Sequence, residues 1–221
     1  TRTPSSAASD VYKRQGYSLG GNRGPSLLGL SPDVNRGALW VGGAAFSHQI
    51  ERCTQYDQFD DLMESVIGYP SQLDRAVVIS LIQSLWDATD TNTWTTLSEG
   101  WGDRVQPFEM IYIGSIGDLQ ISNISTSRAL RNADASILSS SSIHPYGLPI
   151  TEGGEGTTGN VGVYFDGGFS HAPEQNLLGQ EPHPAHNWVA GVEAAHRMAF
   201  EYLFNGYVVD RCDGSCVYDA A

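Results

Sequence analysis

The sequence has few basic residues, few cysteines and no long apolar run. Its 221 residues hold 12 Lys and Arg against 25 Asp and Glu, which gives a formal net charge of -13. Such a charge argues against nucleic acid and anionic membranes as partners, because both need a basic surface to bind. The absence of a long apolar run argues against a membrane-spanning helix. With 40% hydrophobic residues, the chain fits one globular domain that buries a core.

The three cysteines are Cys53, Cys212 and Cys216. The last two form a C-x3-C pair that a tight turn through Asp213 and Gly214 could close into a disulfide. The alternative is half of a metal site, although no second cysteine pair is present to complete a zinc centre. A disulfide would favour a secreted or periplasmic protein. Cys53 is then left over, and a buried, inert thiol is expected.

Residues 1–15 differ from the rest of the chain. They are polar, small and aperiodic, and the stretch SSAASDVYKRQ resembles translated adapter sequence left by library construction in environmental sequencing. We therefore interpret residues 1–15 as a non-native, disordered segment that contributes nothing to the fold. On this interpretation the native sequence starts at Gly16, and the strands before it are missing.

Beyond Gly16, helical and strand patterns alternate, which predicts a parallel α/β sheet flanked by helices. In the helix at 71–86, Leu73, Val77, Leu81 and Leu85 recur at helical spacing. Helices are predicted at 19–30, 57–67, 71–86, 122–132 and 189–204. Strands are predicted at 37–45, 108–113, 135–138 and 161–165, with a Gly-rich loop at 144–160.

The first candidate for chemistry is Ser18, in the G-x-S-x-G pattern from Gly16 to Gly20. This pattern can mark a nucleophilic serine on a strained strand-to-helix turn, with glycines where flanking side chains would clash. A helix and a buried strand follow it, as that turn requires. The competing interpretation is a Gly-rich turn in which the serine has no chemical role.

The second candidate is Asp118, which lies just after the clearest strand, FEMIYI. Functional groups of parallel sheets gather at the carboxyl ends of strands. An acid that orients a catalytic histidine belongs at this point of a serine hydrolase. The competing role is an Asx turn or a helix cap.

A base would come from the histidines between the last strand and the last helix: His171, His183 and His186. The chain order Ser, Asp, His is that of an α/β-hydrolase. His196 lies within the last helix, in register with apolar residues, and is expected to pack in the core.

These motifs together resemble the α/β-hydrolase family, in particular a branch of uncharacterised bacterial esterase- or lipase-like hydrolases. The resemblance rests on the serine motif followed by LGLSPDVNRGALWVGG, then LIQSLWDATD, IGDLQISN and the final histidine helix ending in GYVVDRCDGSC. It implies that residues 16–221 are the C-terminal part of a hydrolase domain. It also implies Ser18 as nucleophile, Asp118 as acid and His186 as base, with His171 and His183 as alternatives.

The resemblance further implies that the Leu19 backbone N–H forms half of an oxyanion hole. The expected activity is hydrolysis of a small ester or amide through an acyl-enzyme, without a cofactor. Since the other oxyanion donor of the family lies before the serine, a catalytically incompetent fragment is the main alternative. A third possibility is a metal site built on His183-x-x-His186 with His171 and Asp166, although this spacing matches no standard zinc signature.

Overall fold

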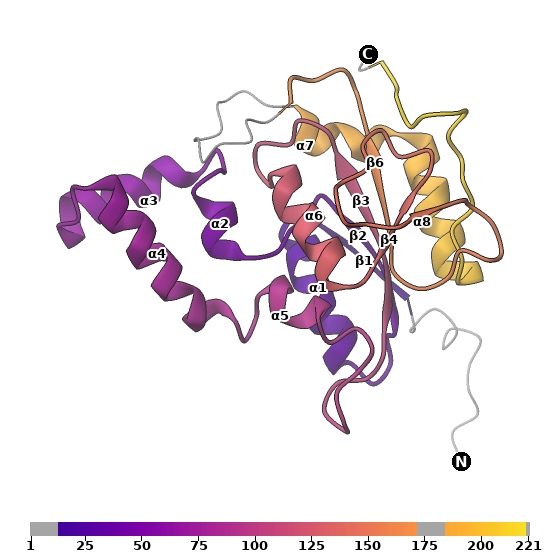
Figure 1. Cartoon of the computed structure of the whole chain (residues 1–221), viewed down its shortest axis with the longest axis horizontal. Helices are drawn as coiled ribbons and strands as arrows, with labels where there is room; N and C mark the ends of the chain where they lie inside the picture. Colours follow the sequence, from indigo (N-terminus) through magenta and orange to yellow (C-terminus); the bar gives the residue numbers. More distant parts are fainter. Residues whose placement is uncertain (1–12, 172–183, 220–221) are drawn as a thin grey trace.

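The centre of the protein is one open sheet of six parallel strands, in the order β1-β2-β3-β6-β4-β5 (Figure 1). The computed structural model describes residues 13–171 and 184–219. The strands are β1 (Lys13–Tyr17), β2 (Arg36–Trp40), β3 (Glu109–Ser115), β4 (Ser136–Leu138), β5 (Ile150–Thr151) and β6 (Val161–Phe165). The predicted α/β class and parallel sheet are thus confirmed, and β1 and β5 are strands that the sequence patterns did not predict.

Helices cover both faces of the sheet, which gives three layers. On one face lie α1 (Leu19–Leu30), α5 (Thr91–Thr95) and α6 (Asn123–Asn132). On the other lies α8 (Glu193–Asn205), preceded by α7 (Ala185–Trp188) and the 3-10 turn η3 (Val189–Gly191). The predicted last helix at 189–204 is therefore two pieces, and it ends at Gly206, whose φ of 82° is left-handed.

Strand β3 shows how the two cores are separated. Met110 and Tyr112 point into the core under α1, α5 and α6, while Ile111 and Ile113 point into the core under α8. All four side chains are 0–1% exposed. Successive side chains of a strand face opposite sides, so the continuous apolar run FEMIYI suits a strand buried on both faces.

Strand β1 corrects the expectation that residues 1–15 form no structure. Lys13, Arg14 and Gln15 belong to β1, which pairs in parallel with β2 and leads directly into Ser18. Residues 1–12 lie outside the described part of the chain. The pattern was missed because KRQGY lacks apolar alternation. As an edge strand it is held by backbone pairing, and by the Gln15 side chain, which accepts a hydrogen bond from Trp40 Nε1 at 3.1 Å.

Between β2 and β3 the chain makes a helical excursion away from the sheet (Figure 1). It holds α2 (Phe46–Ile50), α3 (Tyr56–Leu62), the π-helical turn η2 (Met63–Ile67) and α4 (Gln72–Trp86). These elements share a small core of their own, formed by Ile50, Cys53, Met63 and Ile79. Cys53 is a free, buried thiol, as predicted, and burial raises its pKa.

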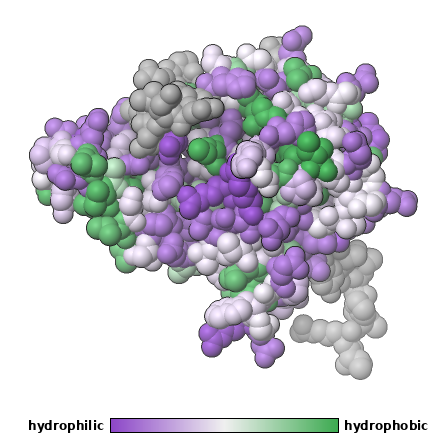
Figure 2. Space-filling model, in the orientation of Figure 1, coloured by the Kyte–Doolittle hydropathy of each residue, from purple (hydrophilic) through white to green (hydrophobic). Residues whose placement is uncertain are grey.

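Helix α4 forms as predicted, but its regularly spaced apolar residues face outward. Leu73, Val77, Leu81 and Leu85 are 51–78% exposed. Figure 2 shows hydrophobic surface on the left, in the region where Figure 1 draws α3 and α4. The helix packs instead through the opposite face, where Arg75 and Ile79 are buried. Periodicity identifies an apolar face and does not establish that the face is covered.

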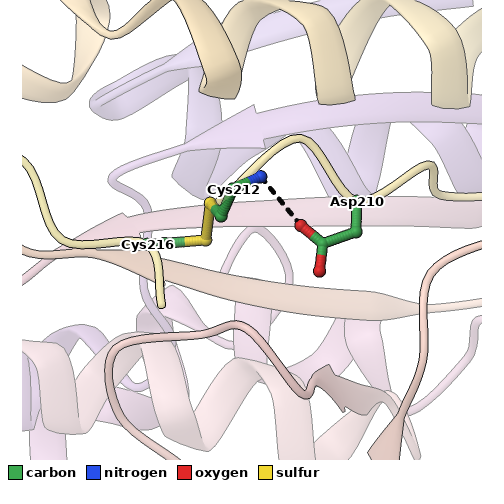
Figure 3. A group of neighbouring side chains, drawn as sticks. All are labelled: Asp210, Cys212 and Cys216. Atoms are coloured by element: carbon green, nitrogen blue, oxygen red, sulfur yellow. Dashed lines mark hydrogen bonds between the residues drawn. A yellow bond between two sulfur atoms is a disulfide. The ribbon is translucent and has the colours of Figure 1, made fainter. Parts of the chain in front are cut away.

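Cys212 and Cys216 form a disulfide in the segment after α8, with their Cα atoms 5.1 Å apart (Figure 3). Of the two alternatives for this C-x3-C pair, the structure therefore has the disulfide. The Cys216 backbone N–H donates to Ser140 O at 2.7 Å, and Asp166 N–H donates to Cys216 O at 2.9 Å. These two backbone hydrogen bonds anchor the C-terminal segment beside the ends of β4 and β6, and the disulfide closes the turn within that segment.

Reduction of this bridge is expected to raise the intact mass by about 2 Da and to lower the free energy of unfolding by about 2 kcal/mol. The loss is small because the closed loop is short. Intact mass spectrometry and urea titration, each with and without reductant, measure both effects. For the double variant Cys212→Ser/Cys216→Ser, reductant should change neither the intact mass nor the free energy of unfolding. A wild-type mass that reductant leaves unchanged contradicts the bridge.

Candidate active site

Ser18 sits at the turn between β1 and α1 in a conformation that is rare for a residue with a side chain. Its φ is 55° and its ψ is -114°. Positive φ is sterically costly for L-residues, and it persists only where the surroundings enforce it. Here the Ser18 N–H donates to Trp40 O at 3.0 Å, and its own carbonyl accepts from Asn22 N–H at 3.0 Å. Ser18 is only partly buried.

The start of α1 is adapted to Pro25, which lies inside the helix. Proline has no N–H to donate to the carbonyl four residues earlier, which belongs to Gly21. The buried Tyr112 hydroxyl donates to that carbonyl instead, at 2.9 Å. The Asn22 side chain accepts from Gly43 N–H at 2.7 Å. The structure thus shows each of these polar groups at the start of α1 with a hydrogen-bond partner.

The two glycines of the serine motif have different roles. A Cβ on Gly16 would lie 2.2 Å from Gly20 O. Strand β1 and helix α1 can therefore lie this close together only because residue 16 has no side chain. A Cβ on Gly20 would meet nothing within 4 Å. On the helix side, the residue that must lack a side chain is Gly21, because a Cβ added there would lie 2.5 Å from Trp40 O. The expectation that both motif glycines prevent clashes is therefore right for Gly16 and wrong for Gly20.

Gly16→Ala is expected to lower the free energy of unfolding by about 1–3 kcal/mol, because a backbone clash must be relieved. Gly20→Ala is the matched control and should leave stability unchanged or raise it by up to about 1 kcal/mol, since Ala favours helix. Urea unfolding of the two variants measures the difference. Equal stability of the two would contradict this account of the turn.

Asp118 lies in the turn between β3 and α6 and is 1% exposed. Its Oδ1 accepts from the backbone N–H groups of Gln120 at 2.8 Å and Ile121 at 2.9 Å. Its Oδ2 lies 2.7 Å from His186 Nδ1. The two roles weighed for this residue, an Asx turn and a partner for a histidine, are thus both present, one on each oxygen. The turn itself depends on Gly117, whose φ is 79°.

His186 lies in the short helix α7 and is 2% exposed. With Nδ1 bonded to Asp118, the carboxylate favours the tautomer in which Nδ1 carries the proton and Nε2 can accept one. Nε2 is buried and has no hydrogen-bond partner among the described residues, so Ser18 Oγ is not bonded to it here. In unliganded enzymes catalytic hydrogen bonds are often long and close only with substrate.

Tyr17 connects the serine turn to His186. Its ring lies edge-on to the imidazole, with the centroids 5.7 Å apart. Its hydroxyl donates to the His186 carbonyl oxygen. Burial, and then the nearby Asp118 charge, raise the Tyr17 pKa to about 12. Sequence reasoning missed Tyr17, because a contact over 169 residues leaves no local signal. Its place directly before the serine was the one available clue.

The other histidines stand apart from this pair. His171 is exposed, and His183 lies outside the described residues. His196 is exposed rather than packed in the core, so that prediction was wrong. It lies at the margin of the buried face of α8, where its ring contacts Trp40 and its Nε2 lies 2.6 Å from Ala190 O.

The N-terminus of α1 supplies donors next to Ser18. Leu19 is the first residue of the helix, so its N–H has no acceptor within the helix. The first turn has no acidic residue to offset the partial positive charge of the helix end. A developing negative charge beside Ser18 would therefore be stabilised. Leu19 itself is 62% exposed and lines a small cavity of about 20 Å³ together with Phe46 and Trp86.

Metal-binding donors gather at one place among the described residues, where Asp210, Cys212 and Cys216 bring ligand atoms within 4.8 Å of one another. Figure 3 shows why this group is not a metal site in this state: the two sulfurs are bonded to each other. Asp210 accepts from Cys212 N–H at 2.9 Å and so stabilises the turn. Asp166, named with the histidines in the metal hypothesis, accepts from Gly168 N–H at 2.8 Å.

Comparison with known proteins gives no independent assignment: no protein-family model matches the chain, and no curated protein is significantly similar to it.

Across the described residues, every helix is too short or too polar to cross a membrane.

Proposed function

We propose that the protein is a serine hydrolase of the α/β-hydrolase type, acting on an ester or amide through an acyl-enzyme. One observation carries the proposal: a strained serine turn and a buried Asp–His pair lie at the carboxyl ends of strands in the same parallel sheet. The two features are connected by Tyr17, the residue before the serine. Carboxyl ends of parallel strands are where the catalytic groups of such sheets gather.

In the proposed reaction, His186 Nε2 accepts the Ser18 hydroxyl proton as Oγ attacks the substrate carbonyl carbon. Asp118 holds the imidazole through Nδ1–H and stabilises the imidazolium that forms. The Leu19 N–H donates to the oxyanion of the tetrahedral intermediate. The bond to the leaving group breaks as that group takes the proton from Nε2. Water then attacks the acyl-enzyme by the same route and releases the acid.

The arrangement favours His186 over His171 and His183 as the base. His186 is bonded to Asp118, whereas His171 is exposed. The metal alternative lacks support among the described residues, because the donors that gather there are Asp210, Cys212 and Cys216 rather than His186, His171 and Asp166. The proposed chemistry needs no cofactor. The disulfide supports an oxidising compartment, so we place the enzyme outside the cytoplasm, either secreted or periplasmic.

The proposal is tested by trapping the acyl-enzyme. Incubation with an activated acetyl ester followed by rapid acid quench should raise the intact mass by about 42 Da, the mass of one acetyl group replacing a proton, as covalent catalysis requires. The adduct should decay as the ester is consumed. Hydrolysis that proceeds in the folded protein with no adduct at any quench time would contradict an acyl-enzyme mechanism.

A further inference from the structure

Tyr17 holds the main chain of His186, while Asp118 holds its ring. The Tyr17 hydroxyl donates to the His186 carbonyl oxygen, and its ring contacts the imidazole at an interplanar angle of 70°. Asp118 lies 2.7 Å from Nδ1. These anchors come from two different strands, since Tyr17 ends β1 and Asp118 follows β3. Together they leave Nε2 as the one ring nitrogen without a partner among the described residues.

Helix α7 needs such anchors, because it has only four residues. A helix this short has almost no stability of its own, so tertiary contacts set its position. Ala185 and Val189 are fully buried and fix its depth against the sheet. The hydrogen bond from the Tyr17 hydroxyl to the His186 carbonyl adds a directional contact to β1, the strand that leads into Ser18.

We propose that Tyr17 is a positioning residue that sets the location of His186 relative to Ser18. This inference rests on the proposed function. Tyr17 and Ser18 are consecutive in the chain, and Ser18 is held in its strained conformation by the bond to Trp40 O. Because one peptide unit joins Tyr17 to Ser18, the contact from Tyr17 to His186 couples the position of the proposed base to that of the proposed nucleophile. Misplacement by about 1 Å can cost on the order of 10²-fold in rate.

The charge state of Tyr17 suits this role at all ordinary pH values. Its hydroxyl stays protonated, and therefore able to donate, until the pH approaches its pKa of about 12. The cause is burial first and the Asp118 charge second. Because the pKa is raised above its usual 10, the bond is fully present below pH 10 and is lost as the pH rises toward 12.

Tyr17→Phe tests the proposal, because it removes the hydroxyl and keeps the ring. We expect kcat on an activated ester, and the rate at which a fluorophosphonate labels Ser18, to fall about 10- to 100-fold. KM should change by less than about twofold, because substrate binding does not involve this bond. Removing one neutral hydrogen bond costs only about 1 kcal/mol of stability, so the variant should fold.

The matched control is Tyr202→Phe, which also removes a buried hydroxyl-to-carbonyl bond, to Gly159 O at 2.8 Å. It should lose similar stability and keep the wild-type rates. Rates are expressed per folded molecule, with the folded fraction read from urea titration. If wild-type Ser18 is labelled and Tyr17→Phe reacts at the same rate, Tyr17 has no positioning role while the hydrolase proposal stands. If the wild type is not labelled, the hydrolase proposal fails and the role of Tyr17 fails with it.

Discussion

His186→Ala is expected to lower kcat on an activated ester by about 10⁴-fold, because in the proposed mechanism the Ser18 nucleophile would lose its base. The residue is 2% exposed and paired with Asp118, so its loss removes both the proton acceptor and the only partner seen for Asp118 Oδ2 among the described residues. Steady-state hydrolysis by wild type and variant measures the effect, and circular dichroism confirms that both are folded.

The matched controls for this variant are the two exposed histidines nearest in sequence among the described residues. His171→Ala and His196→Ala should each change kcat by less than about threefold, as expected of surface residues. If His171→Ala were the inactive variant, the Asp118–His186 pair would be structural and the base would lie in the preceding loop. That result would contradict the assignment of His186.

Ser18→Ala is expected to reduce hydrolysis by about 10⁴- to 10⁶-fold, to the level that binding and oxyanion stabilisation provide alone. Ser26→Ala is the matched control on α1, the helix that follows Ser18, since the Ser26 hydroxyl donates to Arg23 O at 2.7 Å. It should retain full activity. Initial rates at saturating ester measure both.

Combining the two deletions gives a sharper test than either alone. If Ser18 and His186 act as one unit, Ser18→Ala/His186→Ala should be no slower than the slower single variant. Independent losses would multiply, and the double variant would then be slower by the product of the two factors. A multiplicative outcome would argue that the two residues affect the rate through separate, structural routes.

The parts of the fold that could be predicted are those with a strong local pattern. The apolar run before Asp118 predicted a strand at 108–113, which the structure has as β3, and the structure adds that both faces of this strand are buried. The serine motif and the apolar residues after it predicted α1 over Leu19–Leu30, the bounds that the structure has. Topology predicted that Asp118 would meet a histidine of the later loop, because the ends of parallel strands converge on one edge, and the family resemblance singled out His186 among the three candidates.

The parts that could not be predicted depend on contacts distant in sequence. Strand β1 is an edge strand whose pairing with β2 uses backbone groups, so its polar side chains gave no signal. The outward face of α4 could not be foreseen, because Leu81 at 70% exposure has the same spacing as a core residue. The separate roles of Gly20 and Gly21 depend on where Trp40 O lies. The contact from Tyr17 to His186 joins residues that are 169 positions apart in the chain.

The most direct test of the proposed nucleophile is to find which residue a fluorophosphonate modifies in the folded protein. Labelled protein is digested, and the modified peptide is sequenced by mass spectrometry, with urea-unfolded protein as the control. The account predicts one adduct, on Ser18, in the folded protein and none in the unfolded protein, because reactivity depends on the strained turn and on His186. A folded protein that takes no adduct, or takes it on another residue, would contradict the central claim that Ser18 is a nucleophile.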